Sequence, residues 1–112
     1  MFEKPAGYKR FHGVFMKSRI HIRIFGDVQG VFFRAGVQDQ AGDIGGITGW
    51  VKNMDDGSVE VMAEGEKEKL IQLLEWCSHG PAGAGVDRVE HEWKKSSNEF
   101  KSFEIKYGRD AI

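Results

Sequence analysis

A loop that joins a strand-like segment to a helix-like segment carries the first candidate for chemistry. Apolar residues alternate up to Ile24, the chain then passes Gly26 and Gly30, and Arg34 follows where helical spacing begins. Such a turn presents backbone N–H groups at the positive end of a helix, which favours anions. Arg34 adds a planar, permanently charged guanidinium that matches phosphate geometry. The loop therefore predicts a site for a phosphoryl group and chemistry on that group.

The spacing alone also allows a structural interpretation. The glycines can serve only to shape a tight turn, and Arg34 can be a solvated arginine in a first helical turn. Asn53 is a second polar position with two interpretations, because it precedes the turn-like residues 54–57 and asparagine is common in turns. Taken alone, each segment favours the structural interpretation over a functional site.

The composition limits the classes of protein to which this chain can belong. The chain has 112 residues, of which 40% are hydrophobic and 29% charged, which is typical of one globular domain. A net charge of −1 gives no basic field for nucleic acid. The single cysteine, Cys77, excludes an intramolecular disulfide and suits a reducing compartment. No apolar stretch resembles a membrane span or a secretory signal, so we expect a cytoplasmic protein.

The N-terminal segment lacks the periodicity of the rest. Glycines and Pro5 alternate there with scattered basic and aromatic residues, and regular alternation begins only after Met16. We therefore expect residues 1–16 to be a flexible N-terminal extension, with Met16 as a candidate for the biological start. Residues 17–112 are expected to form the domain.

Periodicity from residue 19 onward predicts five strands and two helices. Strands are expected at 19–26, 47–53, 58–64, 86–93 and 103–107, and helices at 34–44 and 66–78. Asp56-Gly57 signals a hairpin between the second and third strands, and the polar stretch 94–102 predicts another before the last strand. The order β-α-β-β-α-β is the ferredoxin-like pattern. It implies an α+β two-layer sandwich, an antiparallel sheet with two helices on one face and the other face open to solvent.

Side-chain alternation assigns the faces of these elements. In the third strand, Val59 and Val61 alternate with Glu60 and Glu64, which gives the strand one polar face. Cys77 lies on the apolar face of the second helix and is expected in the core. The four histidines lack metal-ligand spacing and predict no metal site: they are His12, His21, His79 and His91.

Together, the two polar segments resemble the acylphosphatase family. Residues 24–34, IFGDVQGVFFR, match its first signature, G-x-V-Q-G-V-x-F-R, at every constrained position. Residues 49–65, GWVKNMDDGSVEVMAEG, match its second signature, and GPAGAGVDRVE at 80–90 and FEIKY at 103–107 are similar to later landmarks. The resemblance covers roughly residues 19–108, and the family's ferredoxin-like fold agrees with the predicted order of elements.

The resemblance implies metal-independent hydrolysis of a small-molecule acyl phosphate to a carboxylate and inorganic phosphate, without a cofactor. Nothing in the sequence demands more than a monomer. The family's two catalytic residues fall on Arg34 and Asn53. Arg34 and the backbone amides of the loop would hold the phosphate, and Asn53 would position the attacking water. The loop residues are Asp27, Val28, Gln29, Gly30, Val31, Phe32 and Phe33.

One local feature departs from the family pattern, and a second would oppose the binding of a phosphate. The stretch between Arg34 and Asn53 is one residue longer than usual, and Gly45-Gly46 is expected to absorb the extra glycine in the turn between helix and strand. A carboxylate at Asp27 would repel a phosphate unless its side chain points away.

Two other classes of function share this element order. RNA-recognition domains need aromatic residues in the third strand, whereas residues 58–64 read SVEVMAE, so no nucleic-acid partner is expected. A regulatory domain that binds a small ligand without turnover would not need both Arg34 and Asn53, and it is the alternative to the enzyme. Release of phosphate from benzoyl phosphate would distinguish the two.

Overall fold

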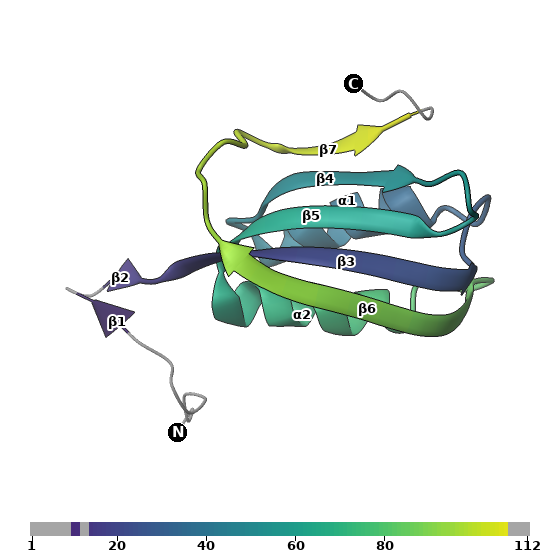
Figure 1. Cartoon of the computed structure of the whole chain (residues 1–112), viewed down its shortest axis with the longest axis horizontal. Coiled ribbons are helices and arrows are strands. Elements are labelled where there is room, and N and C mark those ends of the chain that lie inside the picture. The colour runs from purple at the N-terminus through teal and green to yellow at the C-terminus, as the bar shows by residue number, and fades with distance from the viewer. Residues whose placement is uncertain (1–9, 12–13, 108–112) are drawn as a thin grey trace.

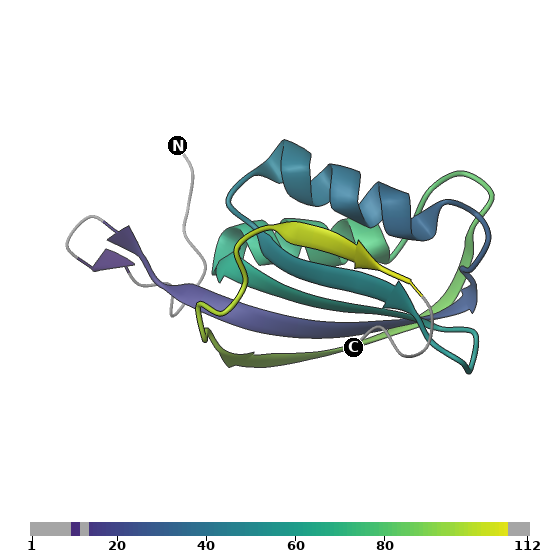
Figure 2. The same cartoon turned by 90° about the horizontal axis from the view of Figure 1, so that it is seen from above.

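The computed structural model describes residues 10–11 and 14–107 of the chain. From residue 17 onward these residues form one sheet with two helices on one face (Figures 1 and 2). The elements in chain order are β3 (Lys17–Asp27), α1 (Phe33–Ile44), β4 (Thr48–Asn53), β5 (Val59–Glu66), α2 (Lys67–Cys77), β6 (Gly85–Lys95) and β7 (Phe103–Lys106). The predicted ferredoxin-like α+β sandwich is confirmed.

Most of the predicted N-terminal extension, namely residues 1–9 and 12–13, lies outside the described residues. The part that is described contains two short strands, β1 (Arg10–Phe11) and β2 (Val14–Phe15), which pair antiparallel with each other. Figure 1 shows this pair beyond the end of the sheet where β3 begins. The flexibility of residues 1–16 stays a prediction.

The directions of the strands bring three chain segments to one end of the sheet. The strand order is β6-β3-β5-β4-β7. Because β3 and β4 are both antiparallel to β5, they point the same way, and β7 is parallel to β4. The loop after β3, the end of β4 and the end of β7 therefore lie together, on the right in Figure 1.

The last strand lies at the opposite edge of the sheet from its predicted position. The predicted hairpin at residues 94–102 is wrong, because β6 continues to Lys95 and the chain then crosses to the far edge. There Phe103 and Ile105 pack against the core, and β7 pairs parallel with β4. Gln38 of α1 donates a hydrogen bond to the Phe103 carbonyl at 3.1 Å. The sheet is therefore mixed rather than wholly antiparallel.

The core lies between the sheet and the helices. Its fully buried members on the sheet alternate along the strands, as the period of two requires, and those on the helices follow helical spacing. They include Ile20, Ile22, Ile24, Val51, Val59, Val61 and Ala63 from the sheet, and Val37, Leu70, Leu73 and Cys77 from the helices. Burial raises the pKa of the Cys77 thiol to about 12, so it stays neutral.

Three glycines in and after α1 occupy positions that disfavour other residues, one because of a close contact and two because of their backbone conformation. A Cβ at Gly36 would lie 2.5 Å from the ring of Trp76, so glycine allows α2 to pack closely against α1. Gly45 and Gly46 have φ values of +83° and +74°, which favour glycine, and they form the turn before β4. Gly45 and Gly46 therefore lie in the turn between helix and strand, where the extra glycine was expected.

Glu64 is buried, although its strand alternation placed it on a polar face open to solvent. The connection from β6 to β7 crosses this end of the sheet and covers the side chain, which is 3% exposed. Its carboxylate accepts hydrogen bonds from the backbone N–H of Ser97 at 2.8 Å and of Asn98 at 2.9 Å. It also pairs with the Arg19 guanidinium at 2.6 Å. Glu64 thus anchors the crossing segment.

We expect Glu64→Gln to lower the free energy of unfolding by about 3 kcal/mol at pH 7. Burial alone would raise the pKa of Glu64, but the hydrogen bonds from Ser97, Arg19 and Asn98 outweigh it and lower the pKa from 4.5 to about 2. This contribution is present above pH 4.5 and is lost as the pH falls toward 2. Urea unfolding at pH 7 and at pH 3 measures it, and the difference between variant and wild type should shrink to about 1 kcal/mol at pH 3.

Glu92→Gln is the matched control for that experiment. Glu92 lies exposed on the edge strand β6, and its Oε1 is 3.8 Å from Lys94 Nζ. Exposed pairs contribute little, so the control should stay within about 0.5 kcal/mol of the wild type. A Glu64→Gln protein as stable as the control would contradict the anchoring role.

Candidate active site

Arg34 and Asn53 line one pocket at the end of the sheet where β3, β4 and β7 finish. Arg34 lies in the first turn of α1, directly after the loop that follows β3, and Asn53 is the last residue of β4. The pocket has a volume of about 270 Å³ and is lined by Val28, Gly30, Phe32, Phe33, Arg34, Ala35, Asn53, Ile105 and Tyr107. The strand directions therefore bring together two residues that are far apart in the sequence.

The loop before α1 is folded as a cradle of main-chain donors. Gly30 and Phe32 both have left-handed backbones, with φ values of +74° and +61°. Among the described residues, no group accepts a hydrogen bond from the backbone N–H groups of residues 29–33. Together with the positive end of the α1 dipole, these free N–H groups favour a bound anion.

The Arg34 side chain is held in place by contacts that leave its positive charge without a carboxylate partner. Its Nη1 donates to the Lys106 carbonyl at 3.4 Å, and its Cζ lies 4.8 Å from the centre of the Tyr107 ring. The other arginines between residues 16 and 107 all pair with carboxylates: Arg19 with Glu64 and Glu99, Arg23 with Asp56, and Arg88 with Glu90. No described carboxylate pairs with Arg34, so its guanidinium can bind a phosphoryl group.

The amide oxygen of Asn53 is buried and has no hydrogen-bond partner among the described residues. An unpaired buried acceptor is rare and costs about 1–3 kcal/mol. The side chain lines the same pocket as Arg34. The oxygen can therefore accept a hydrogen bond from a water molecule in that pocket.

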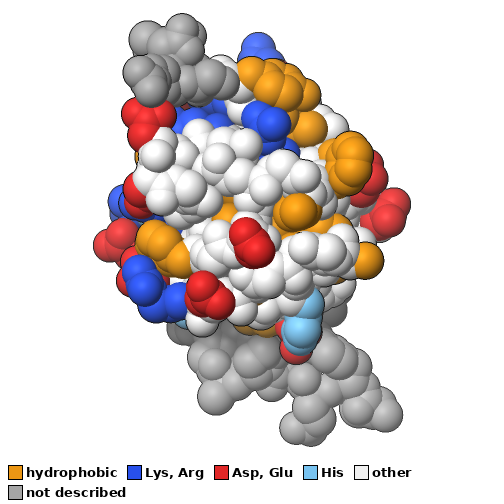
Figure 3. Space-filling model, turned by 90° about the vertical axis from the view of Figure 1, so that its right-hand side faces the viewer, with side chains coloured by type: hydrophobic (Ala, Val, Ile, Leu, Met, Phe, Trp, Pro, Cys, Tyr) orange, Lys and Arg blue, Asp and Glu red, His pale blue; other side chains and the backbone are white. Residues whose placement is uncertain are grey.

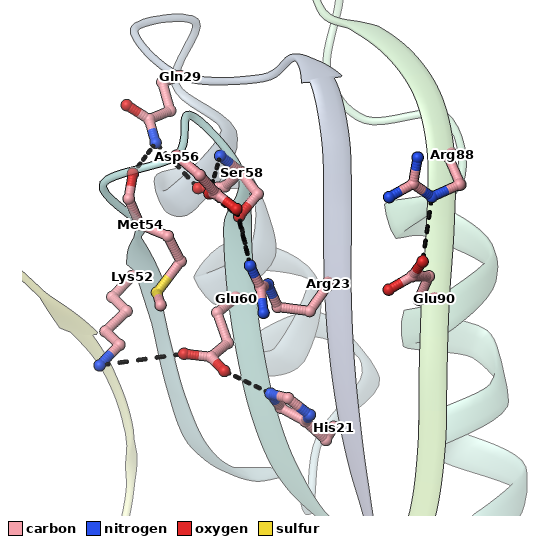
Figure 4. A network of polar contacts seen from close by, with 10 residues as sticks. All are labelled: His21, Arg23, Gln29, Lys52, Met54, Asp56, Ser58, Glu60, Arg88 and Glu90. Carbon is pink, nitrogen blue, oxygen red and sulfur yellow. Dashed lines mark hydrogen bonds and ion pairs between the residues drawn. The ribbon is translucent and has the colours of Figure 1, made fainter.

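Gln29 joins the loop to the β4–β5 turn, a role that the sequence did not predict. Its Nε2 donates to the carbonyls of Met54 at 2.8 Å and Ser58 at 2.9 Å (Figure 4). The turn is itself held by the Asp56 carboxylate, which accepts hydrogen bonds from the Ser58 N–H at 2.9 Å and the Arg23 guanidinium at 2.9 Å. The Gln29 side chain thus fixes the loop that precedes Arg34 relative to Asn53.

The predicted loop residues divide into two groups. Val28, Gly30, Phe32 and Phe33 line the pocket, whereas Asp27, Gln29 and Val31 do not. Asp27 ends β3 and is paired with Gly85 of β6, so its exposed side chain lies outside the pocket lining. Ile105 and Tyr107 were not predicted as site residues. The FEIKY segment marked this strand, but only its pairing with β4 brings it to the pocket.

The other polar candidates do not form a second reactive centre in the described part of the chain. His21 pairs with Glu60 at 2.5 Å on the open face of the sheet (Figure 4), and His79 and His91 are exposed. His12 lies outside the described residues. Within the described ranges, no three His, Cys, Asp or Glu side chains are grouped to hold a metal ion. Neither α1 nor α2 has the length and apolarity needed to cross a membrane.

Comparison with known sequences shows similarity to the acylphosphatase family. The family model for acylphosphatase matches residues 20–105. An acylphosphatase of Pelotomaculum thermopropionicum is 42% identical over 91 residues, which make up 81% of this chain and 98% of that protein.

Two solved structures are similar to this fold. An acylphosphatase from Coxiella burnetii matches with a TM-score of 0.75 at 37% identity and covers 81% of this chain and 94% of that one. The acylphosphatase from Bacillus subtilis matches with a TM-score of 0.76 at 36% identity and covers 80% of this chain and 99% of that one. The family match includes both Arg34 and Asn53.

Proposed function

The chain belongs to the acylphosphatase family, and we propose that it hydrolyses acyl phosphates to a carboxylate and inorganic phosphate in the pocket that contains Arg34 and Asn53. One observation carries the proposal. An arginine without a carboxylate partner and a buried amide oxygen without a hydrogen-bond partner line the same pocket, beside a loop of free N–H groups. A phosphoryl group and a water molecule would satisfy all of these groups at once.

In the proposed mechanism, the loop residues 27–33 and Arg34 hold the phosphoryl group. Charge on its three equatorial oxygens develops in the transition state, and preorganised N–H donors and one guanidinium can stabilise it. The leaving group is a carboxylate, which is stable and needs little help from a general acid. Catalysis by these groups requires no metal ion.

Asn53 positions the attacking water. Its amide is neutral and too weak a base to ionise the water, but it can fix the direction of attack. The water oxygen forms a bond to phosphorus as the bond from phosphorus to the acyl oxygen breaks. The electron pair of that bond leaves with the carboxylate, and the proton of the water passes to the phosphate product. The loop contains no Cys, His or Ser, and its one carboxylate, Asp27, lies outside the pocket lining, so we expect no phosphoenzyme.

Incubation with benzoyl phosphate in the presence of EDTA tests the proposal. Repeated turnover to benzoate and phosphate is expected, and reaction in H₂¹⁸O should place the label in phosphate rather than benzoate. Stoichiometric binding without turnover would favour a regulatory domain instead, and loss of activity with EDTA would contradict the metal-independent mechanism.

We propose further that the catalytic unit is the domain of residues 17–112, acting as a cytoplasmic monomer. All of the groups assigned to the mechanism come from one chain and lie between residues 27 and 53. A single buried cysteine suits a reducing compartment.

A further inference from the structure

Phe32 adopts a conformation that its residue type disfavours. Its backbone is left-handed, with φ of +61°, a region that bulky residues rarely occupy. Asn98 is the other non-glycine residue with positive φ in the described ranges, and asparagine tolerates this region. The Phe32 backbone belongs to the loop of free N–H groups, so the strain fits a functional position.

The ring of Phe32 gains little from burial within the protein. The residue is 84% exposed, yet it lines the pocket that holds Arg34 and Asn53. One exposed apolar side chain is ordinary on a protein surface. An exposed phenyl ring on a strained backbone beside a polar site is different, because neither its conformation nor its exposure stabilises the free protein.

Tyr107 supplies a second exposed aromatic ring to the same pocket. It is 67% exposed, and its ring lies 4.8 Å from the Arg34 Cζ. Ile105 and Val28 add apolar lining near these rings. Figure 3 looks onto this end of the molecule, and hydrophobic and basic side chains adjoin each other in its upper half. The pocket therefore combines polar groups suited to phosphate with an aromatic rim.

We propose that Phe32 and Tyr107 form a subsite for the acyl group of the substrate, which selects acyl phosphates with an apolar, planar acyl group over those with a small one. The inference rests on the proposed hydrolysis of acyl phosphates. When the phosphoryl group is held by the loop and Arg34, the acyl group must extend toward the open side of the pocket. There an aryl group can contact the exposed rings, through burial of apolar surface and through the edge-to-face or offset contacts that aromatic rings prefer. An acetyl group is too small to make these contacts.

The ratio of kcat/KM for benzoyl phosphate to kcat/KM for acetyl phosphate tests the subsite. Phe32→Asn removes the ring and keeps a residue that tolerates the left-handed backbone. Any effect of the substitution on the phosphate loop is common to both substrates and cancels in the ratio. We expect the ratio to fall on the order of tenfold in Phe32→Asn and to fall in Tyr107→Ser as well. The loss should lie mainly in KM for benzoyl phosphate, because the acyl contact is the same in the ground state and the transition state.

Ile71→Asn is the matched control. Ile71 is an exposed apolar residue, at 40%, on α2 and outside the pocket lining, so its replacement should leave both rates and their ratio unchanged. An unchanged ratio in both Phe32→Asn and Tyr107→Ser would overturn the acyl subsite while leaving the hydrolytic function intact. Failure of the wild type to hydrolyse either substrate would instead overturn the proposed function.

Discussion

Replacement of Arg34 by alanine is expected to lower kcat/KM for benzoyl phosphate by on the order of 10³-fold or more, by analogy with arginines that stabilise other phosphoryl-transfer transition states. Arg34 is the arginine between residues 16 and 107 that no described carboxylate neutralises, and it adjoins the positive end of α1. Its full charge is therefore available to the transferring group. Steady-state kinetics measure the loss, and inhibition by inorganic phosphate should weaken in parallel because the same guanidinium would bind the product.

Arg34→Lys tests whether the positive charge alone is sufficient or whether the planar shape of the guanidinium is also needed. Lysine keeps the positive charge but lacks the planar fork that contacts two phosphoryl oxygens, so it should also be poorly active. The contact with the Lys106 carbonyl is long, at 3.4 Å, so neither substitution should unfold the protein. Thermal unfolding followed by circular dichroism checks this. A loss in kcat/KM of less than tenfold in Arg34→Ala would contradict the assignment.

Asn53→Ala is expected to lower kcat by on the order of 10²-fold, because a water that is not aligned with phosphorus attacks rarely. KM should change little, since the proposed phosphate contacts are those of Arg34 and the loop. This split between kcat and KM distinguishes Asn53 from Arg34, whose loss should affect both. Initial rates over a range of benzoyl phosphate concentrations measure it.

The stability of Asn53→Ala is the control for a structural role. The Asn53 amide oxygen is buried without a partner among the described residues, and removal of such a group relieves its desolvation cost. The variant should therefore unfold at the same urea concentration as the wild type or at a higher one. A large loss of stability together with the loss of activity would indicate that Asn53 only holds the hairpin turn.

Much of the local structure could be predicted from the sequence. The alternation through Ile20, Ile22 and Ile24 predicted β3, and the Asp56-Gly57 pair predicted the β4–β5 turn, because both signals depend on neighbouring residues only. The two motifs were sufficient to name Arg34 and Asn53 as site residues. These two residues line one pocket because β3 and β4 run in the same direction beside β5.

The sequence by itself determined which segments are strands and helices, and it named Arg34 and Asn53 as the candidates for the chemistry. The tertiary structure decided on which edge β7 lies, that Glu64 is buried, that Gln29 joins the loop to the turn, and that Tyr107 reaches the pocket. The physical reason is the range of the interactions. Periodicity reports how one segment divides between apolar and polar surroundings, whereas pairing at a sheet edge and burial of a carboxylate depend on residues that are distant along the chain and meet only after folding.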